Sequence, residues 1–114
     1  MNLLIVGSRS ITKFDLSGYV PQEADLIISG GADGVDSIAE KYADEHRLSK
    51  LILRPRYDLY GKAAPLKRNE RMVDLVDEIL VIWDGISRGA MYTAKYAKSK
   101  NKTFTVIDLL EKGK

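Results

Sequence analysis

The chain has 114 residues, of which 45% are hydrophobic and 30% charged, and its formal net charge is +2. This length predicts one domain, residues 1–114, large enough to bury a core without disulfides or metals. The absence of cysteine excludes a disulfide framework and thiolate chemistry, and it favours a reducing, cytoplasmic location. No apolar run approaches the ~20 residues that span a bilayer, so we expect no membrane partner, and the first ten residues indicate a strand rather than a signal peptide.

Five short apolar runs follow one another at regular spacing along the chain. They cover residues 3–6, 26–28, 51–53, 79–83 and 104–107. Because polar and apolar residues do not alternate within the runs, they are typical of strands buried on both faces, as in a parallel sheet.

Helical patterns separate most of these runs. The first covers residues 35–43, with Asp33 as the expected N-cap. The second begins at Pro65, a residue suited to the first helical turn, and the third places alanines on one stripe between residues 90 and 97. Small residues on that stripe would let the helix lie close to a sheet.

Two segments have no clear period. Residues 10–21 are too short and broken for a long helix, and residues 54–64 are interpreted as a loop that crosses the site. The alternation of strands and helices predicts an α/β fold: a Rossmann-like, doubly wound sheet of about five parallel strands with helices on both faces. Such sheets bind ligands at the carboxyl ends of their strands, where the strand order reverses.

Three turns that contain glycine follow the predicted strands, and they are the candidate ligand-binding segments. They are Gly7-Ser8-Arg9, residues 30–34 and residues 84–89. Glycines in the second turn would let the backbone approach an anion, and the following helix points free amides the same way. Tight packing of helix against strand explains such glycines equally well. In the third turn Ser87 can cap the following helix.

The charged and aromatic residues near these turns have two interpretations each. Arg9 can form a forked contact with phosphate or lie on the surface, and the same holds for Arg68. Asp36 can accept from a ribose hydroxyl or act as a partner of the helix dipole. Trp83 can stack on a base or close the core. His46, the only histidine, indicates a solvated helix end, so we expect no metal and no cofactor.

Four motifs, taken in order, resemble the SLOG superfamily. This Rossmann-like group contains the DNA-processing protein A domain and the Lonely Guy phosphoribohydrolases, and the chain is most similar to its small stand-alone branch of unknown function. The motifs are Gly7-Ser8-Arg9, Gly30-Gly31-Ala-x-Gly34-Val35-Asp36, Arg68-Asn69-x-x-Met72 and Trp83-Asp84-Gly85-x-Ser87-x-Gly89.

The resemblance implies a pocket for a nucleotide or a nucleotide-derived ligand such as an ADP-ribose-like molecule, and it implies a homodimer. The residues that it implicates are Ser8, Arg9, Gly30, Gly31, Asp36, Arg68, Asn69, Ser87 and Gly89. The turns themselves add Gly34, Asp84 and Gly85 to the candidate site.

The chain departs from the enzymes of the superfamily after the fourth predicted strand. Those enzymes show a Pro-Gly-Gly-x-Gly-Thr-x-x-Glu motif, whereas here Ala90 stands at the threonine position and Thr93 at the glutamate position. The arginine that precedes this strand in the enzymes is matched by Arg68. The resemblance therefore implies that the cationic half of a hydrolytic site is kept, while its carboxylate half is missing from the expected place. Asp36 or Asp84 could substitute for that carboxylate.

Three functions follow, in order of preference. The first is a module that binds a nucleotide-like small molecule. The second is an N-glycosidic hydrolase of nucleoside monophosphates, with Arg68 as the candidate catalytic residue. DNA binding comes last, because the net charge is small and aromatic residues are not interleaved with the basic ones. Two basic clusters occur, one of Lys62, Lys67, Arg68 and Arg71 and one of Lys95, Lys98, Lys100 and Lys102. A solvated face is the simplest interpretation of each, and it is preferred for the second because Lys is favoured near a helix C-terminus.

Overall fold

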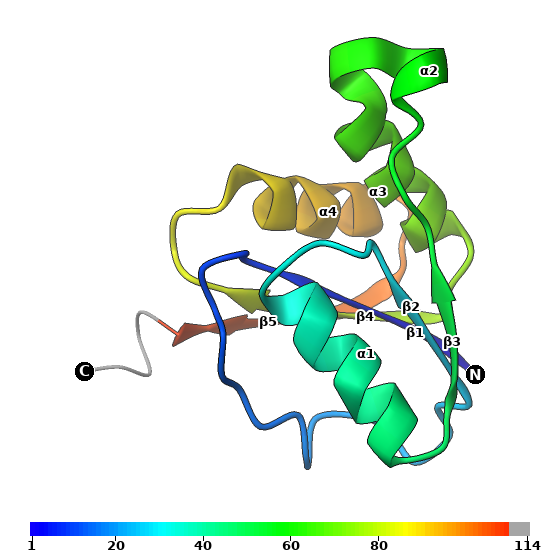
Figure 1. The fold of residues 1–114 in the computed structure, drawn as a ribbon, viewed down its shortest axis with the longest axis vertical. Helices are drawn as coiled ribbons and strands as arrows, with labels where there is room; N and C mark the ends of the chain where they lie inside the picture. Colours follow the sequence, from blue (N-terminus) through cyan, green and yellow to red (C-terminus); the bar gives the residue numbers. More distant parts are fainter. Residues whose placement is uncertain (110–114) are drawn as a thin grey trace.

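A computed structural model describes residues 1–109, and its centre is a sheet of five parallel strands. The strands are β1 (Asn2–Gly7), β2 (Leu26–Ser29), β3 (Ser49–Ile52), β4 (Glu78–Trp83) and β5 (Thr103–Asp108). Their order across the sheet is β3-β2-β1-β4-β5, and each neighbouring pair is parallel (Figure 1). The predicted parallel sheet is confirmed, and chain order reverses between β1 and β4.

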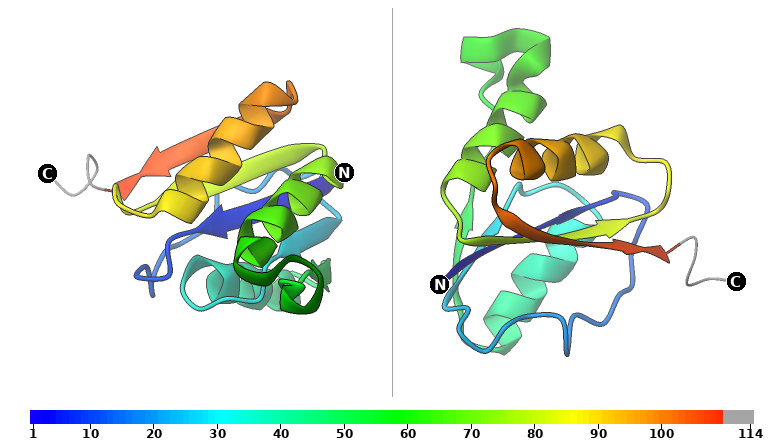
Figure 2. Two further views of the ribbon diagram at one scale, coloured as in Figure 1. Left: turned by 90° about the horizontal axis from the view of Figure 1, so that it is seen from above. Right: turned by 180° about the vertical axis from the view of Figure 1, so that it is seen from behind.

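Helices cover both faces of the sheet, as predicted. Helix α1 (Val35–Glu45) packs on one face, while α3 (Ala64–Asp74) and α4 (Arg88–Ser99) pack on the other (Figures 1 and 2). Since successive residues of a strand point to opposite faces, Leu3 belongs to the core under α1 and Leu4 to the core under α3 and α4. Within residues 1–109, every helix is too short or too polar to cross a membrane.

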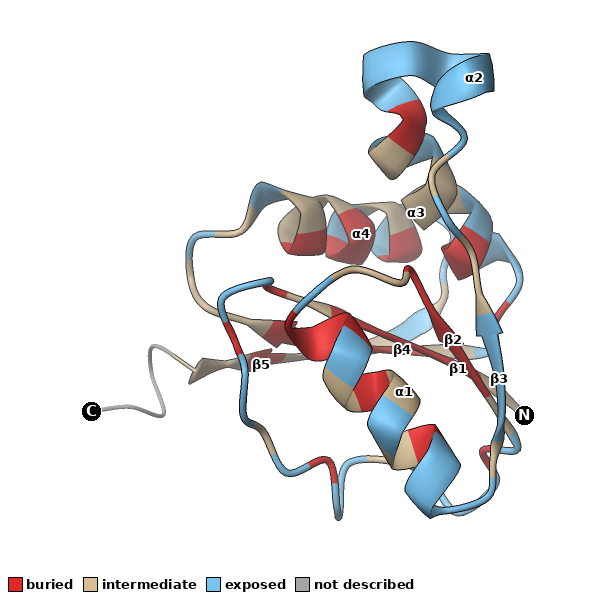
Figure 3. Cartoon of the chain, in the orientation of Figure 1, coloured by how far each residue is buried: buried red, intermediate tan, exposed pale blue. Residues whose placement is uncertain are grey.

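The two edge strands are more exposed than the sequence predicts. In β3 only Ile52 is even partly buried, and β5 alternates between exposed and more buried residues (Figure 3). The central strands β1 and β4 have four consecutive buried residues each. Burial on both faces therefore holds at the centre of the sheet but is wrong at its edges, where helices cover the sheet incompletely.

The connection from β1 to β2 contains no helix, in agreement with the short, broken pattern of residues 10–21. Residues 8–25 form turns and irregular backbone, and Ile11 and Leu16 bury their side chains in the core under α1. Gly18, with φ +86°, and Pro21 break the segment before a helical period can develop.

Residues 54–64 do not form the predicted loop across the site. They contain the short helix α2 (Tyr57–Tyr60), a 3-10 turn over Gly61–Ala63 and the first residue of α3. Figure 1 shows α2 standing at one end of the molecule, beyond α3. None of the residues of α2 is buried, so this segment lies outside the core.

The N-caps of α1 and α4 differ. The N-cap of α1 is Gly34 rather than the predicted Asp33, and no side chain caps this helix. Instead the Val35 amide donates to the carbonyl oxygen of Ser8 at 3.3 Å, which joins α1 to the turn after β1. In α4 the predicted cap is confirmed, because Ser87 Oγ accepts from the Ala90 amide at 3.4 Å.

Candidate functional site

A cavity of about 410 Å³ lies at the carboxyl ends of β1 and β4, where the strand order reverses. This is the position at which doubly wound sheets bind ligands, and its volume falls within the range of roughly 300–1,000 Å³ that small-molecule sites occupy. The turns after β1, β2 and β4 contribute its walls together with α3 and α4. Seven predicted site residues line it: Arg9, Asp36, Arg68, Asn69, Asp84, Ser87 and Gly89.

Arg68 fastens α3 to the ends of β2 and β3. Its Nη1 donates to the carbonyl oxygens of Gly30 at 2.7 Å and Leu53 at 3.2 Å, and its Nε donates to Oδ1 of Asn69 at 2.8 Å. Burial lowers the pKa of Arg68, and the negative charge of Asp36 opposes that shift. Within residues 1–109 the Nη2 group has no hydrogen-bond partner, so its two N–H groups are available to an anion.

Arg9 brings a second guanidinium group to the same cavity. Its side chain is exposed and forms no hydrogen bond or ion pair with any residue in the described part of the chain. The charge of Arg9 contributes to lowering the pKa of Arg68, so the two cations repel each other across the cavity. A bound anion would relieve this repulsion.

The carboxylate of Asp36 is held under the turn that follows β2. Its side chain is buried, and Oδ2 accepts from the Ala32 amide at 3.1 Å. The neighbouring Gly31 amide donates to Ser29 Oγ at 3.1 Å. Burial raises the pKa of Asp36 in spite of the amide and of Arg68. The expectation that the amides of this turn cradle phosphate is therefore wrong for Gly31 and Ala32, because the protein already occupies them.

Asp84 organises the turn between β4 and α4. Oδ1 accepts from the amides of Ile86 and Ser87, both at 2.8 Å, and Oδ2 accepts from Ser10 Oγ at 2.8 Å. The Ser87 amide above all, with the Ile86 amide and the Ser10 hydroxyl, holds the pKa of Asp84 far below its usual range. Both oxygens are thus engaged, which argues against a role for Asp84 in holding ribose and for the Ser87 amide in holding phosphate.

Asp84→Ala is expected to lower the free energy of unfolding by about 1–2 kcal/mol at neutral pH, because two amides lose a charged acceptor. The pKa of Asp84 is lower in the folded than in the unfolded protein, where it is about 3.9. Its contribution is therefore complete above that value and declines as the pH falls below about 4. Urea unfolding at about pH 7 and at about pH 2.5 measures both effects.

Asp84→Asn is the matched variant, since its amide oxygen can still accept from the turn while the charge is lost. We expect it to retain more stability than Asp84→Ala at neutral pH. If the difference between parent and Asp84→Ala is as large at about pH 2.5 as at about pH 7, the charge of Asp84 does not stabilise the turn.

The N-terminus of α4 retains unpaired amides at the cavity. The Ser87 cap accepts from Ala90, which leaves the first two helical amides, those of Arg88 and Gly89, without a partner in the described residues. A Cβ added at Gly89 would meet nothing within 4 Å, so open space lies beside this backbone. Because Gly89 lines the cavity, its amide is available to a ligand there.

Five predicted residues do not line the cavity: Ser8, Gly30, Gly31, Gly34 and Gly85. Ser8 is fully buried, and its Oγ accepts from the Asp84 amide at 3.0 Å, which ties the turn after β1 to the turn after β4. A Cβ at Gly30 would lie 2.6 Å from Nη1 of Arg68. Gly30 is thus needed for the close approach of this arginine.

Apolar residues that sequence reasoning missed form another part of the cavity lining: Val6, Pro65, Leu66, Met72 and Ile86. Ile86 is 81% exposed. The only feature of the sequence that indicates its place in the cavity is its position in the turn, between Gly85 and Ser87. Trp83 does not line the cavity. Its indole N–H donates to the Ser87 carbonyl oxygen at 2.9 Å and its ring packs on the core, so the core interpretation of Trp83 holds.

The cavity presents no carboxylate at the place where the hydrolases of the resembled superfamily carry glutamate. Thr93 is buried there, and its hydroxyl donates to the Gly89 carbonyl oxygen at 2.9 Å. Residues 1–109 contain no cluster of His, Cys, Asp and Glu that could hold a metal ion. His46 is the C-cap of α1, where its exposed ring stacks on Tyr42.

No protein-family model, curated protein or solved structure matches the chain. Function is therefore inferred from the chemistry of the cavity and from the motifs. The features that bear on it are the two guanidinium groups, the unpaired amides of α4 and the apolar residues opposite them.

Proposed function

We propose that the chain binds a nucleotide or a nucleotide-derived small molecule in the cavity at the ends of β1 and β4. One observation carries the proposal: Arg9 and Arg68 reach the same cavity, and neither forms an ion pair within residues 1–109. Guanidinium groups beside unpaired helical amides match the charge and the hydrogen-bonding capacity of a phosphate group.

The rest of the cavity suits the rest of a nucleotide. Oδ1 of Asn69 accepts from Arg68, so its Nδ2 group is free to donate to a sugar or base. Pro65, Leu66 and Ile86 provide an apolar surface for the base. The four motifs shared with the SLOG superfamily support the same ligand class.

Binding is preferred to N-glycosidic hydrolysis because the two carboxylates that line the cavity, those of Asp36 and Asp84, already accept hydrogen bonds from the protein. Hydrolysis needs a carboxylate that stabilises an oxocarbenium-like state or activates water. Asp84 already accepts three hydrogen bonds from Ser10, Ile86 and Ser87, and Asp36 lies buried beneath the Ala32 amide. Thr93 stands at the position of the enzymes' glutamate.

Arg9→Ala is expected to weaken binding of AMP, ADP or ADP-ribose about tenfold or more, since a hydrogen bond to a charged group contributes about 1.5–3 kcal/mol. The melting temperature should not change, because Arg9 is exposed and has no partner within residues 1–109. Calorimetric titration of the three nucleotides into parent and variant measures the affinities.

Lys98→Ala is the control, because it removes an exposed cation from the last turn of α4, away from the cavity. Its affinities should equal those of the parent. The proposal is wrong if the parent binds none of the three nucleotides, or if Arg9→Ala binds them as tightly as the parent does. Release of free base by the parent over hours would favour the hydrolase instead.

A further inference from the structure

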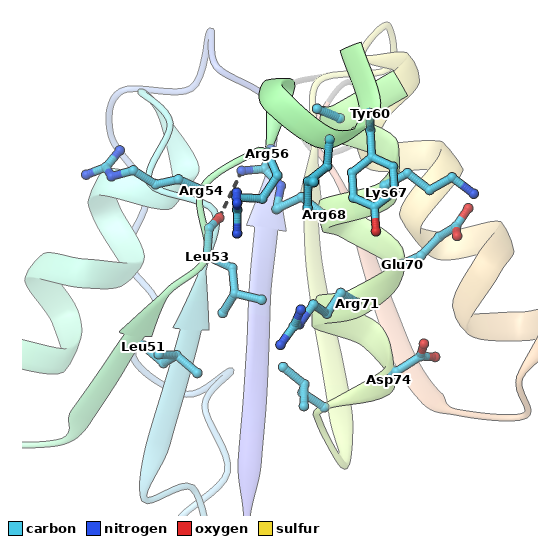
Figure 4. Close-up of a pocket in the computed structure, with 13 residues that line it drawn as sticks. Leu51, Leu53, Arg54, Arg56, Tyr60, Lys67, Arg68, Glu70, Arg71 and Asp74 are labelled. Atoms are coloured by element: carbon cyan, nitrogen blue, oxygen red, sulfur yellow. Dashed lines mark hydrogen bonds between the residues drawn. The ribbon is translucent and has the colours of Figure 1, made fainter. Parts of the chain in front are cut away.

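A second cavity, of about 480 Å³, lies between β3 and α3, outside the proposed nucleotide site (Figure 4). Arg68 lines both cavities and forms the wall between them. The second cavity is an open groove whose apolar lining is aliphatic apart from Tyr60: Leu51, Leu53, Leu59, Ala64 and Leu75. Neither α3 nor α4 covers this part of the sheet, and Leu51 is 43% exposed there.

The groove is strongly basic. Arg54, Arg56, Lys67, Arg68 and Arg71 line it, against two carboxylates, Glu70 and Asp74. Arg56 is paired with Asp58, but the side chains of Lys67 and Arg71 form no hydrogen bond or ion pair in the part of the chain that the structure describes. Arg54 and Arg68 donate only to backbone carbonyls and to the Asn69 amide oxygen.

The two carboxylates do not neutralise the centre of the groove. Figure 4 shows Glu70 and Asp74 on the side of α3 that faces away from Leu51 and Leu53, whereas Arg71 extends toward those leucines. Glu70 accepts from the Tyr92 hydroxyl and Asp74 accepts from the Tyr96 hydroxyl, so both acids are tied to α4. The centre of the groove therefore combines a positive charge with an aliphatic floor.

Exposed apolar side chains gather around the same groove. Four of the eight large hydrophobic residues that are exposed within residues 1–109 line this groove: Leu51, Leu59, Tyr60 and Leu75. Monomeric proteins rarely leave such a patch open unless another molecule binds there. In β3, moreover, one side of the backbone has no strand partner.

We propose that this groove docks an acidic peptide segment of a partner protein, with aliphatic side chains of the segment inserted between Leu51 and Leu75 and a carboxylate of the segment on Arg71. Charge complementarity selects this occupant. A second copy docked through the same groove would bring the two sets of cations together. A nucleic acid would find one aromatic ring, that of Tyr60, among the described residues that line the groove, whereas stacking of successive bases needs several.

Selection from a displayed library of random peptides, with the intact protein as bait, tests the proposal. We expect enriched peptides to combine spaced Leu, Ile or Val with Asp or Glu. Fluorescence polarisation of one enriched, labelled peptide should then show about tenfold weaker binding to Leu51→Ser and to Arg71→Glu. Lys95→Glu, the same charge reversal on the exposed face of α4, should bind the peptide like the parent.

Several outcomes would overturn the proposal. One is that no peptide is enriched, or that the enriched peptides lack acidic residues. Another is that both groove variants bind the peptide as well as the parent does while melting like it. A thymidine oligonucleotide that displaces the peptide and loses affinity in Arg71→Glu would assign the groove to nucleic acid. Sedimentation that shows a dimer in the parent and a monomer in Leu51→Ser would assign it to a second copy.

Discussion

Gly34→Ala is expected to lower the free energy of unfolding by about 3–4 kcal/mol, enough to leave a domain of this size barely folded. Gly34 has φ +76° and ψ −127°, a conformation that L-residues avoid. A Cβ there would lie 2.5 Å from the carbonyl oxygens of both Ser8 and Arg9. These are backbone atoms fixed by β1, so they cannot turn aside. Urea unfolding and the yield of folded protein measure the effect.

Gly61→Ala is the matched control, because it introduces the same backbone strain without a close contact of the added Cβ. Gly61 has nearly the same conformation, with φ +54° and ψ −130°, but a Cβ there would meet nothing within 4 Å. We expect it to cost about 1–2 kcal/mol, the strain alone. Equal losses in the two variants would show that the close approach of α1 to the turn after β1 does not constrain Gly34.

The central part of the fold could be predicted because its physical cause is visible in the sequence. Residues of β1 and β4 contact two helical layers, so successive side chains are all apolar and the run does not alternate. The edge strands β3 and β5 have similar short apolar runs but lack cover. Whether a helix covers a strand depends on the strand order, which local sequence does not encode.

The position of the site could also be predicted, but its hydrogen bonds could not. Seven of the twelve predicted residues line one cavity because parallel strands bring their carboxyl ends to the same edge. An acidic residue near a glycine-bearing turn can accept hydrogen bonds from the backbone of that turn or from a ligand. Its position in the sequence favours neither. The structure shows that Asp36 and Asp84 both accept from their own turns.

Short helix α2 shows why residues 54–64 were misassigned. The segment contains Pro55 and Gly61, which favour loops, and its apolar residues have no core partner that would give them a helical period. Tyr57 and Tyr60 are therefore exposed, and Tyr60 lines the groove. The sequence alone does not show that Lys67 and Arg71 line a groove, because the aliphatic floor of that groove comes from the distant strand β3.

Arg68→Ala is expected to remove nucleotide binding and to lower the free energy of unfolding by about 3 kcal/mol. Its guanidinium group donates to the buried carbonyl oxygen of Gly30 and to that of Leu53, and hydrogen bonds from a charged donor contribute about 1.5–3 kcal/mol. Arg9→Ala should lose nucleotide affinity but keep its stability. Comparing Arg9→Ala with Arg68→Ala therefore distinguishes a residue that only binds the ligand from one that also joins α3 to β2 and β3. Denaturant unfolding and the nucleotide titrations are run on the same samples.

Arg71→Ala is the matched control for stability, because Arg71 is exposed on the same helix and has no partner within residues 1–109. It should change the free energy of unfolding by less than about 0.5 kcal/mol. Arg68→Lys keeps the charge, but its ammonium group cannot bond Gly30 and a phosphate in the forked geometry of a guanidinium, so both losses should be intermediate. If Arg68→Ala is as stable as Arg71→Ala, water satisfies the carbonyl oxygens of Gly30 and Leu53, and Arg68 is free to serve the ligand alone.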